Sequence, residues 1–430
     1  MQLFKVLFFV LSVHVYFFAT AGKCDKELQP IDRTYEPNIK TVLLYPNNDS
    51  LTDAIQPAIM SNKDSRQFLL SFDEITSKAD NYYVRIVNCN ADWTFSNLNS
   101  IMFLDDYNEF RIMDQHVSFS TRITYIHYKF PVPRLKISGN FIVVVYREGD
   151  VDDVILSKRF MIYEPYMNIV PQIKFPITVS ERNTGQQTDF ILNYGAYNII
   201  NPRERLKVVI RQNYNWNNTI TGLNPNIMRD DIKSFEYSFY NNENVFKGYN
   251  EFRFFDLRSL KSNGMNVGLI QLSPNKNEAL LVYDKSRKGQ AYGTYGDLNG
   301  MYAPEQYETK GFEIEPDYVY VSFTLDTKLE DPGRIFITGA LSNWKLDEAF
   351  EMKYDPEEKM YTCEVLLKQG YYNYRYTFLP KNSSVPDEAY FEGSSSIAEN
   401  MYDFIVYYRQ PGGMYDQIIG YKNMDYLGTN

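Results

Sequence analysis

The sequence predicts an all-β protein of three consecutive β-sandwich domains, and three observations lead to this prediction. Aromatic residues make up 16% of the 430-residue chain, with 37 Tyr and 29 Phe, and together with β-branched runs they favour strands. Short apolar runs bounded by Gly, Pro, Asn and Asp recur along the chain. Without a targeting segment about 400 residues remain, which fits two to four domains of ordinary size.

The division of the chain follows from its breaks in composition. Lys5, an apolar run over 6–18 and the small residues before Gly22 indicate a cleaved signal peptide, so we expect an exported protein. No later stretch has the roughly 18 uninterrupted apolar residues that a spanning helix needs. We therefore expect a signal peptide (1–21), an N-terminal arm (22–36), a first sandwich (37–165), a second sandwich with a long connecting loop (166–310), a third sandwich (311–409) and a C-terminal tail (410–430).

The first sandwich is predicted from apolar runs that end at turn residues. The run 141–146 has no polar alternation, which is typical of a strand buried on both faces. The turn residues 148–150 predict a hairpin onto the run 154–163. Further strands are expected at 41–45, 68–72 and 82–89.

The second sandwich alternates strands with unusually long loops. Strands are expected at 168–171, 189–194, 206–212 and 251–255. The Asn-rich loop 213–226 carries Trp216, and the run 284–309, rich in Gly, Tyr and charge, is typical of a long connecting loop. Loops of such length in compact proteins are usually functional or mobile.

The third sandwich contains the clearest strand pattern of the chain. Apolar residues at 335–337 predict one strand, and strict alternation predicts two more at 361–367 and 371–378. Because Lys368-Gln369-Gly370 separates the last two, we expect a hairpin there and a β-meander overall. Strands at 318–325 and 401–408 complete the domain.

Composition excludes several classes of function. A net charge of −10 argues against binding to nucleic acid or to anionic membranes. Cys24, Cys89 and Cys363 are too few for a disulfide framework or a structural zinc site, and we expect Cys89 and Cys363 to be buried thiols. Once the signal peptide is removed, only His116 and His127 remain for histidine chemistry.

No catalytic motif is present, so we predict no enzymatic activity, no cofactor and no metal site. Asp92 beside Trp93 is the one start for a glycosidase hypothesis, in which a carboxylate lies in an aromatic cleft. An Asp at the end of a strand more often accepts hydrogen bonds from nearby backbone groups.

Two segments of the third domain form a recognisable pair of motifs. They read Gly339-Ala340-Leu341-Ser342-Asn343-Trp344 and Leu367-Lys368-Gln369-Gly370-Tyr371-Tyr372-Asn373-Tyr374. The pair resembles the early-set, immunoglobulin-like modules that bind glycogen. The resemblance implies an immunoglobulin-like fold and a sugar clamp of two tryptophans, a lysine and a late asparagine. Trp344 matches the first tryptophan, Arg375 takes the lysine position and Asn400 is the candidate asparagine, but the second tryptophan is missing. Loss of half of the clamp favours a core or interface role for Trp344.

Further segments follow one another in a fixed order along the whole chain and include 83–93, 125–131, 138–141, 250–259 and 407–409 together with the two segments above. In this order the chain resembles the plug protein family of the type IX secretion system. The resemblance implies a periplasmic protein, peripheral to the outer membrane, that docks as a monomer on a very large translocon barrel protein. There it would close the periplasmic opening of the pore when no substrate is engaged, without a membrane span of its own.

The composition of long loops makes 213–226 and 284–309 candidates for contact with the barrel. Trp93, Trp216, Trp344, Arg375 and Asn400 are possible interaction or residual sugar-platform residues. Two alternatives remain, an envelope carbohydrate-binding protein and a glycosidase.

Overall fold

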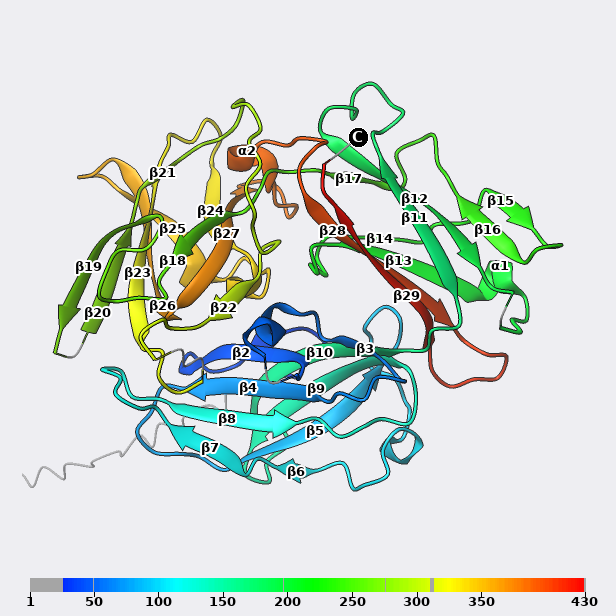
Figure 1. Ribbon diagram of the computed structural model, residues 1–430, viewed down its shortest axis with the longest axis horizontal. Coiled ribbons are helices and arrows are strands. Elements are labelled where there is room, and N and C mark those ends of the chain that lie inside the picture. The colour runs from blue at the N-terminus through cyan, green and yellow to red at the C-terminus, as the bar shows by residue number, and fades with distance from the viewer. Residues whose placement is uncertain (1–25, 49, 196, 275, 310–312, 429–430) are drawn as a thin grey trace, which may run out of the picture.

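The computed structural model describes residues 26–428 except 49, 196, 275 and 310–312 (Figure 1). Its regular structure is almost entirely β-strand, which confirms the predicted all-β class. The α-helices of the described chain are single turns, α1 (Pro202–Arg205) and α2 (Ala389–Glu392). The expected signal peptide, residues 1–21, lies outside the described residues.

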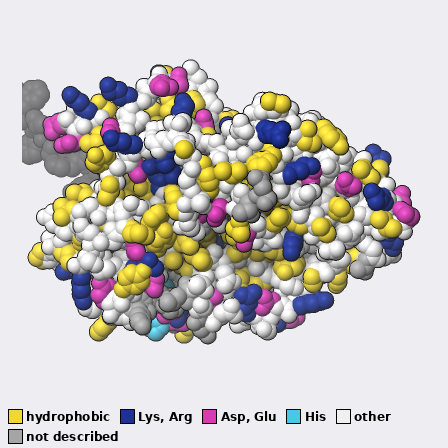
Figure 2. Space-filling model, turned by 45° about the horizontal axis from the view of Figure 1, so that its top comes forward, with side chains coloured by type: hydrophobic (Ala, Val, Ile, Leu, Met, Phe, Trp, Pro, Cys, Tyr) yellow, Lys and Arg dark blue, Asp and Glu magenta, His cyan; other side chains and the backbone are white. Residues whose placement is uncertain are grey.

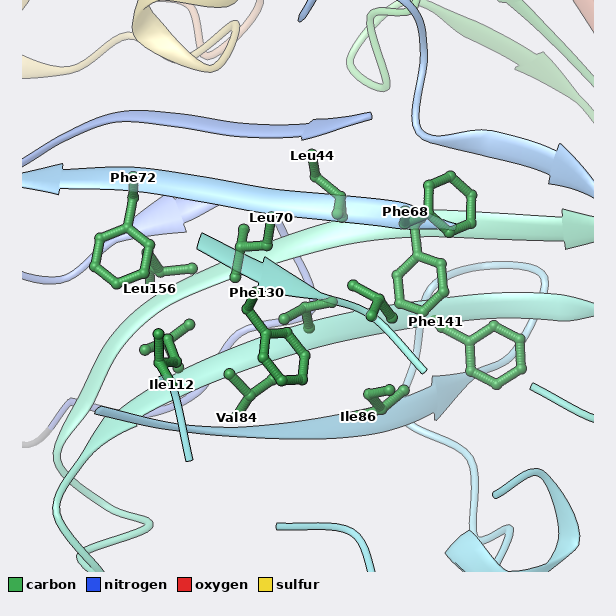
Figure 3. Packing of buried hydrophobic residues seen from close by; sticks show 14 of the residues in the cluster. Leu44, Phe68, Leu70, Phe72, Val84, Ile86, Ile112, Phe130, Phe141 and Leu156 are labelled. Carbon is green, nitrogen blue, oxygen red and sulfur yellow. The ribbon is translucent and has the colours of Figure 1, made fainter. Parts of the chain in front are cut away.

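The N-terminal unit, residues 26–164, is a sandwich of two sheets at the bottom of Figure 1. One sheet has the order β1-β10-β9-β5-β6 with β3 beside β10, and the other has the order β2-β4-β8-β7. Their inner faces bury one apolar cluster, in which Leu44 and Phe72 face Val84 and Phe141 (Figure 3). The elements are β1 (Arg33–Thr34), β2 (Ile39–Pro46), η1 (Leu51–Ile55), β3 (Ile59–Ser61), β4 (Phe68–Glu74), β5 (Tyr82–Cys89), η2 (Ser100–Met102), β6 (Phe110–Arg111), β7 (Asp114–Val117), β8 (Ile126–Pro131), β9 (Gly139–Arg147) and β10 (Val154–Tyr163).

Strand β9 is buried on both faces, as its uninterrupted apolar run predicts. Phe141 and Val143 point into the sandwich core, whereas Ile142 and Val144 join a second cluster with Ile405 of β28 (Asn400–Tyr408). All of them are less than 1% exposed. The outer face of this sheet is therefore an interface with the next unit.

The middle unit is formed by residues 165–250 and 395–428, which are far apart in the sequence. One sheet has the order β11-β12-β16-β15 with β17 beside β12, and the other has the order β14-β13-β28-β29. Phe190 of one sheet packs on Phe404 of the other. Besides β28, the strands are β11 (Asn168–Lys174), β12 (Gly185–Asn193), β13 (Leu206–Gln212), β14 (Thr219–Thr221), β15 (Ile227–Arg229), β16 (Ser234–Tyr237), β17 (Val245–Lys247) and β29 (Gln417–Tyr426).

The inserted unit, residues 251–394, lies within the middle unit in sequence and beside it in space (left of Figure 1). Its strands follow the order β18-β27-β24-β25-β26-β23-β20-β19, with β21 beside β23 and β22 beside β27. The elements are β18 (Arg253–Asp256), β19 (Val267–Ser273), β20 (Lys276–Leu281), β21 (Asp284–Lys285), β22 (Tyr302–Pro304), β23 (Tyr318–Asp326), β24 (Gly333–Thr338), η3 (Ala340–Ser342), η4 (Glu348–Phe350), β25 (Glu351–Asp355), β26 (Met360–Lys368) and β27 (Gly370–Pro380).

The strand pairing differs from the domain boundaries expected at residues 310 and 410. Strand β18 pairs with β27 of the inserted unit, and β28 pairs with β13 of the middle unit. The expected tail contains β29, which pairs with β28 along its length. The expected arm likewise contributes β1, paired with β10. Local composition marks breaks in the chain but carries no signal for pairing across about 200 residues.

The expected hairpin at Lys368-Gln369-Gly370 is wrong. Strand β26 pairs with β23 and β25, whereas β27 pairs with β24 and β18, so the turn joins two strands that do not pair with each other. Val365 of β26 and Tyr374 of β27 nevertheless lie in one core cluster. The immunoglobulin-like topology and the number of independent domains stay predictions.

Charged side chains of both signs are interspersed with apolar ones on the face shown in Figure 2. The acidic excess of the sequence is therefore not gathered there into a field of one sign, which argues against simple electrostatic attraction as the basis of binding at this face.

Candidate functional site

All three tryptophans of the chain line one cavity where the three units meet. Trp93 comes from the N-terminal unit, Trp216 from the middle unit and Trp344 from the inserted unit. The space between these walls, open solvent at the mouth included, is about 1000 Å³.

A tight turn directly after β5 positions Trp93. The Asp92 carboxylate accepts hydrogen bonds from the backbone N–H and the hydroxyl of Thr94, at 3.0 and 2.6 Å. Trp93 has a positive φ of 66° and donates its backbone N–H to the Asn90 carbonyl. The Trp93 side chain is buried, and its indole N–H has no acceptor among the described residues.

The same turn argues against Asp92 as a catalytic acid. Its hydrogen bonds with Thr94 lower the pKa of Asp92, whereas the general acid of a glycosidase needs a raised pKa. Asp92 therefore acts as a turn residue, as the commoner interpretation of the sequence expects.

Two arginines stack on the tryptophan rings. The Arg159 guanidinium of β10 lies 4.5 Å from the ring centre of Trp93 and 5.6 Å from that of Trp216. Arg211 of β13 lies 4.4 Å from the ring of Trp216. The two indoles meet edge to face at 4.9 Å. Cation–π contact uses the face of each guanidinium group, so the N–H groups in its plane stay free to donate hydrogen bonds to other groups.

Two of the cations that line the cavity have carboxylate partners. Arg211 donates two hydrogen bonds, of 2.9 and 2.6 Å, to buried Asp403. Lys158 forms an ion pair of 2.9 Å with Asp32. These charges are therefore compensated within the protein.

The other two cations have no such partner. Within the described chain no carboxylate lies at salt-bridge distance from Arg159 or Lys345. The Arg159 Nε–H donates to the Pro30 carbonyl at 2.7 Å, and no described acceptor lies within hydrogen-bond distance of its two Nη atoms. Burial lowers the pKa of Lys345 to about 8, although the negative charge of nearby Asp32 opposes this shift.

Trp344 follows the short η3 turn of the inserted unit and contacts the middle unit. Asn343 and Trp344 both have positive φ values, 51° and 60°. The Trp344 ring packs edge to face on Phe252 at 5.7 Å, and its carbonyl accepts a hydrogen bond of 2.7 Å from Asn217 Nδ2. Trp344 is therefore a packing and interface residue that also lines the cavity.

Arg375 and Asn400 lie elsewhere, so the sugar clamp expected from the glycogen-binding resemblance is not assembled. Arg375 is buried, lies 3.7 Å from the ring of Phe252 and pairs with Glu388 at 2.8 Å. Asn400 is buried in the middle unit and donates to the Gly248 carbonyl at 2.8 Å. Neither side chain lines the cavity with Trp344.

The two loops expected to contact a partner are largely held within the protein. In 213–226, Asn213 and Asn215 are buried and the segment contains β14. In 284–309, Arg287 pairs with buried Glu392, and Tyr302 stacks on Tyr372 at 5.1 Å. Exposed residues remain in both loops, between 217 and 226 in the first and between 288 and 296 in the second.

A buried charge network that sequence reasoning missed joins the N-terminal and inserted units. Asp73 of β4 accepts hydrogen bonds from Lys368 and Tyr318 of the inserted unit, each at 2.7 Å, and pairs with His127 Nδ1 at 2.6 Å. Arg122 donates its backbone N–H to Asp317 at 2.7 Å. In the sequence, Asp73 and Glu74 at the end of the apolar run 68–74 are the pattern from which buried acidic groups could have been predicted.

An exposed apolar edge on the N-terminal unit was also missed. Strands β6 and β7 are the outermost strands of their two sheets. Large apolar side chains are exposed along the 95–119 edge, with Tyr107 83% and Met113 74% exposed. The full set is Phe95, Ile101, Met102, Tyr107, Met113, Val117 and Phe119. Such density in one segment is typical of a contact surface.

Within the described residues, no group of His, Cys, Asp and Glu side chains could hold a metal ion. Cys89 is buried as expected, and Cys363 is half-buried. Burial raises the pKa of the Cys363 thiol to about 11, which makes it unreactive. Over the described residues, no helix is long and apolar enough to cross a membrane.

The fold and these contacts define a multi-sheet β-protein whose units are joined by buried polar networks. Residues 39–164 match the sequence model described as the type 9 secretion system plug protein 1st domain. The chain belongs to the type 9 secretion system plug protein family, as its sequence resemblance predicts. This membership assigns it to the envelope machinery of type 9 secretion and to a partner within that complex.

A solved structure similar over the full length is that of a hypothetical protein from Parabacteroides merdae. The two sequences are 30% identical, the TM-score is 0.87, and the match covers 93% of this chain and 100% of the other. The arrangement of all three units is therefore shared with that protein. A comparison with curated proteins gives no match.

Proposed function

We propose that the protein is a periplasmic plug that docks on the outer-membrane translocon barrel of the type IX secretion system. It closes the periplasmic opening of the barrel when no substrate is engaged, and it has no catalytic role. The observation that carries this proposal is the match of residues 39–164 to the plug family.

The exposed 95–119 edge supports docking through the matched domain. Strands β6 and β7, each at an edge of its sheet, lie in this segment, and large apolar side chains are exposed along it. Aromatic and methionine side chains such as Tyr107 and Met113 are enriched at protein interfaces. The edge therefore replaces the loops 213–226 and 284–309 as the proposed contact.

Buried contacts between the units support the proposed closing of the pore, because they make the protein rigid. Ala91 donates its backbone N–H to Asp416 at 2.9 Å, and Tyr407 donates to Asn140 at 3.0 Å, so the N-terminal and middle units are joined. The Asp73 network joins the N-terminal and inserted units. A body braced in this way resists deformation when it closes a wide opening.

Affinity capture from solubilised outer membranes tests the docking. Tagged protein at native expression should recover one very large barrel protein. Tyr107→Ser combined with Met113→Ser should reduce recovery at least about tenfold, because central apolar anchors carry most of the binding energy. Tyr240→Ser, at a site 76% exposed on the middle unit, is the matched control and should leave recovery unchanged.

Envelope permeability tests the closure. Cells with the double variant should admit antibiotics that the outer membrane normally excludes, whereas cells with Tyr240→Ser should not. Capture of no barrel protein by the wild-type chain would overturn the proposal.

A further inference from the structure

The cavity lined by the three tryptophans has the features of a small-molecule binding site. Docking on the barrel through the 95–119 edge does not involve this cavity. It is lined by four cations but by a single carboxylate, Asp32, although the chain as a whole is acidic. Asp32 is engaged with Lys158, and Arg211 is engaged with Asp403. Arg159 and Lys345 line the cavity without an ion pair of their own, and the charge of Asp32 is shared among Lys158, Arg159 and Lys345.

The geometry of Arg159 indicates what such a charge can bind. Its ring-stacked guanidinium keeps one face against Trp93 and donates through Nε to the Pro30 carbonyl. No described acceptor meets its Nη atoms, and the indole N–H of 5% exposed Trp93 also has no described acceptor. A planar guanidinium with open N–H groups matches the oxygens of a phosphate or a carboxylate.

We propose that this cavity binds a small oxyanion, a phosphate or carboxylate group, on Arg159 and Lys345. The anion adds negative charge beside two half-buried cations and supplies acceptors for the Arg159 Nη groups. Because Arg159 belongs to the N-terminal unit and Lys345 to the inserted unit, the bound anion bridges these two units. The proposal is independent of docking at the 95–119 edge, which lies outside the cavity.

Tryptophan emission gives a selective readout, since the chain has three tryptophans and all line this cavity. The full mature protein is titrated with inorganic phosphate, glucose 6-phosphate and glucuronate at constant ionic strength. Glucose and sodium chloride are the controls. At least one of the three oxyanions should change the emission with saturation by about 10 mM, and neither control should do so.

The three titrations also separate the sources of the anion. Equal affinity for inorganic phosphate and glucose 6-phosphate assigns the site to a free anion, and tighter binding of glucose 6-phosphate or glucuronate assigns it to an anion carried on a sugar. Saturation by none of the three overturns the proposal.

Arg159→Gln tests the assigned residue and should weaken binding at least about tenfold, which corresponds to loss of one charge-assisted pair. Arg182→Gln, which removes an exposed arginine from the middle unit, is the matched control and should bind as the wild type. Lys345→Gln provides a second variant if Arg159→Gln lowers the melting temperature. Wild-type affinity in both Arg159→Gln and Lys345→Gln contradicts the site.

Discussion

Single buried charges connect the units at the residue scale. Asp73 is fully buried and compensates Lys368, which is 1% exposed, across the boundary between the N-terminal and inserted units. Burial alone would raise the pKa of Asp73, but the charge of Lys368 and the hydrogen bond with His127 hold it below its usual value. The pair is therefore a structural link whose loss leaves an isolated charge in the interior.

Asp73→Asn should lower the free energy of unfolding by about 3–5 kcal/mol, because it leaves the Lys368 ammonium buried without a counter-charge. Unfolding in urea measures this. The double variant Asp73→Asn with Lys368→Met should lose less than the single variant, because no uncompensated charge remains. A loss below about 1 kcal/mol for Asp73→Asn would show that the pair does not brace the units.

The pKa of Asp73 also sets the sign of a pH effect. Because its folded-state pKa is lowered, its contribution is complete above the unfolded value near 3.8 and is lost as the pH falls through the folded pKa. The difference in stability between wild type and Asp73→Asn should therefore be constant near neutral pH and shrink in acid. A difference that grows on acidification would contradict this sign.

The tryptophans show what could be predicted at this scale. Trp93, Trp216 and Trp344 could each be selected from the sequence as a possible interaction residue, but they are far apart in the chain. Their convergence depends on how three units pack, which no local pattern encodes. Arg375 and Asn400, chosen by analogy with a sugar clamp, instead satisfy buried partners.

Strands are the elements that the sequence predicts best. Alternation and uninterrupted apolar runs locate β5, β9, β10 and β23, and the hairpin between β9 and β10 is confirmed. The turn between β26 and β27 was misassigned because a hairpin and a connection between unpaired strands use the same turn residues. Strand β29 was missed because a Pro-Gly-Gly break precedes it.

Truncation after Tyr408 tests the assignment of β29. Strand β29 pairs with β28 and buries Ile418 and Ile419 completely, so its removal should expose one face of the middle unit and make residues 165–250 sensitive to protease. Limited proteolysis with mass spectrometry measures this. Truncation after Gly428 is the control, and equal resistance of both truncated proteins would show that β29 is dispensable.

On the scale of the whole molecule, the three units are held together in two ways. The inserted unit interrupts the chain of the middle unit, and each unit contacts the other two. The second sheet of the middle unit is completed only by β28 and β29. The N-terminal unit contacts both others through β9 and the Asp73 network. This arrangement leaves the 95–119 edge exposed, which is what a stopper that docks through its first domain requires.

Site-specific photo-crosslinking in cells tests the central claim most directly. A photoreactive residue in place of Tyr107 should crosslink to a single very large outer-membrane barrel protein, and the same residue in place of Tyr240 should not. Crosslinks from both positions at equal yield, or from position 107 only to other proteins, would contradict docking of a plug through its 95–119 edge.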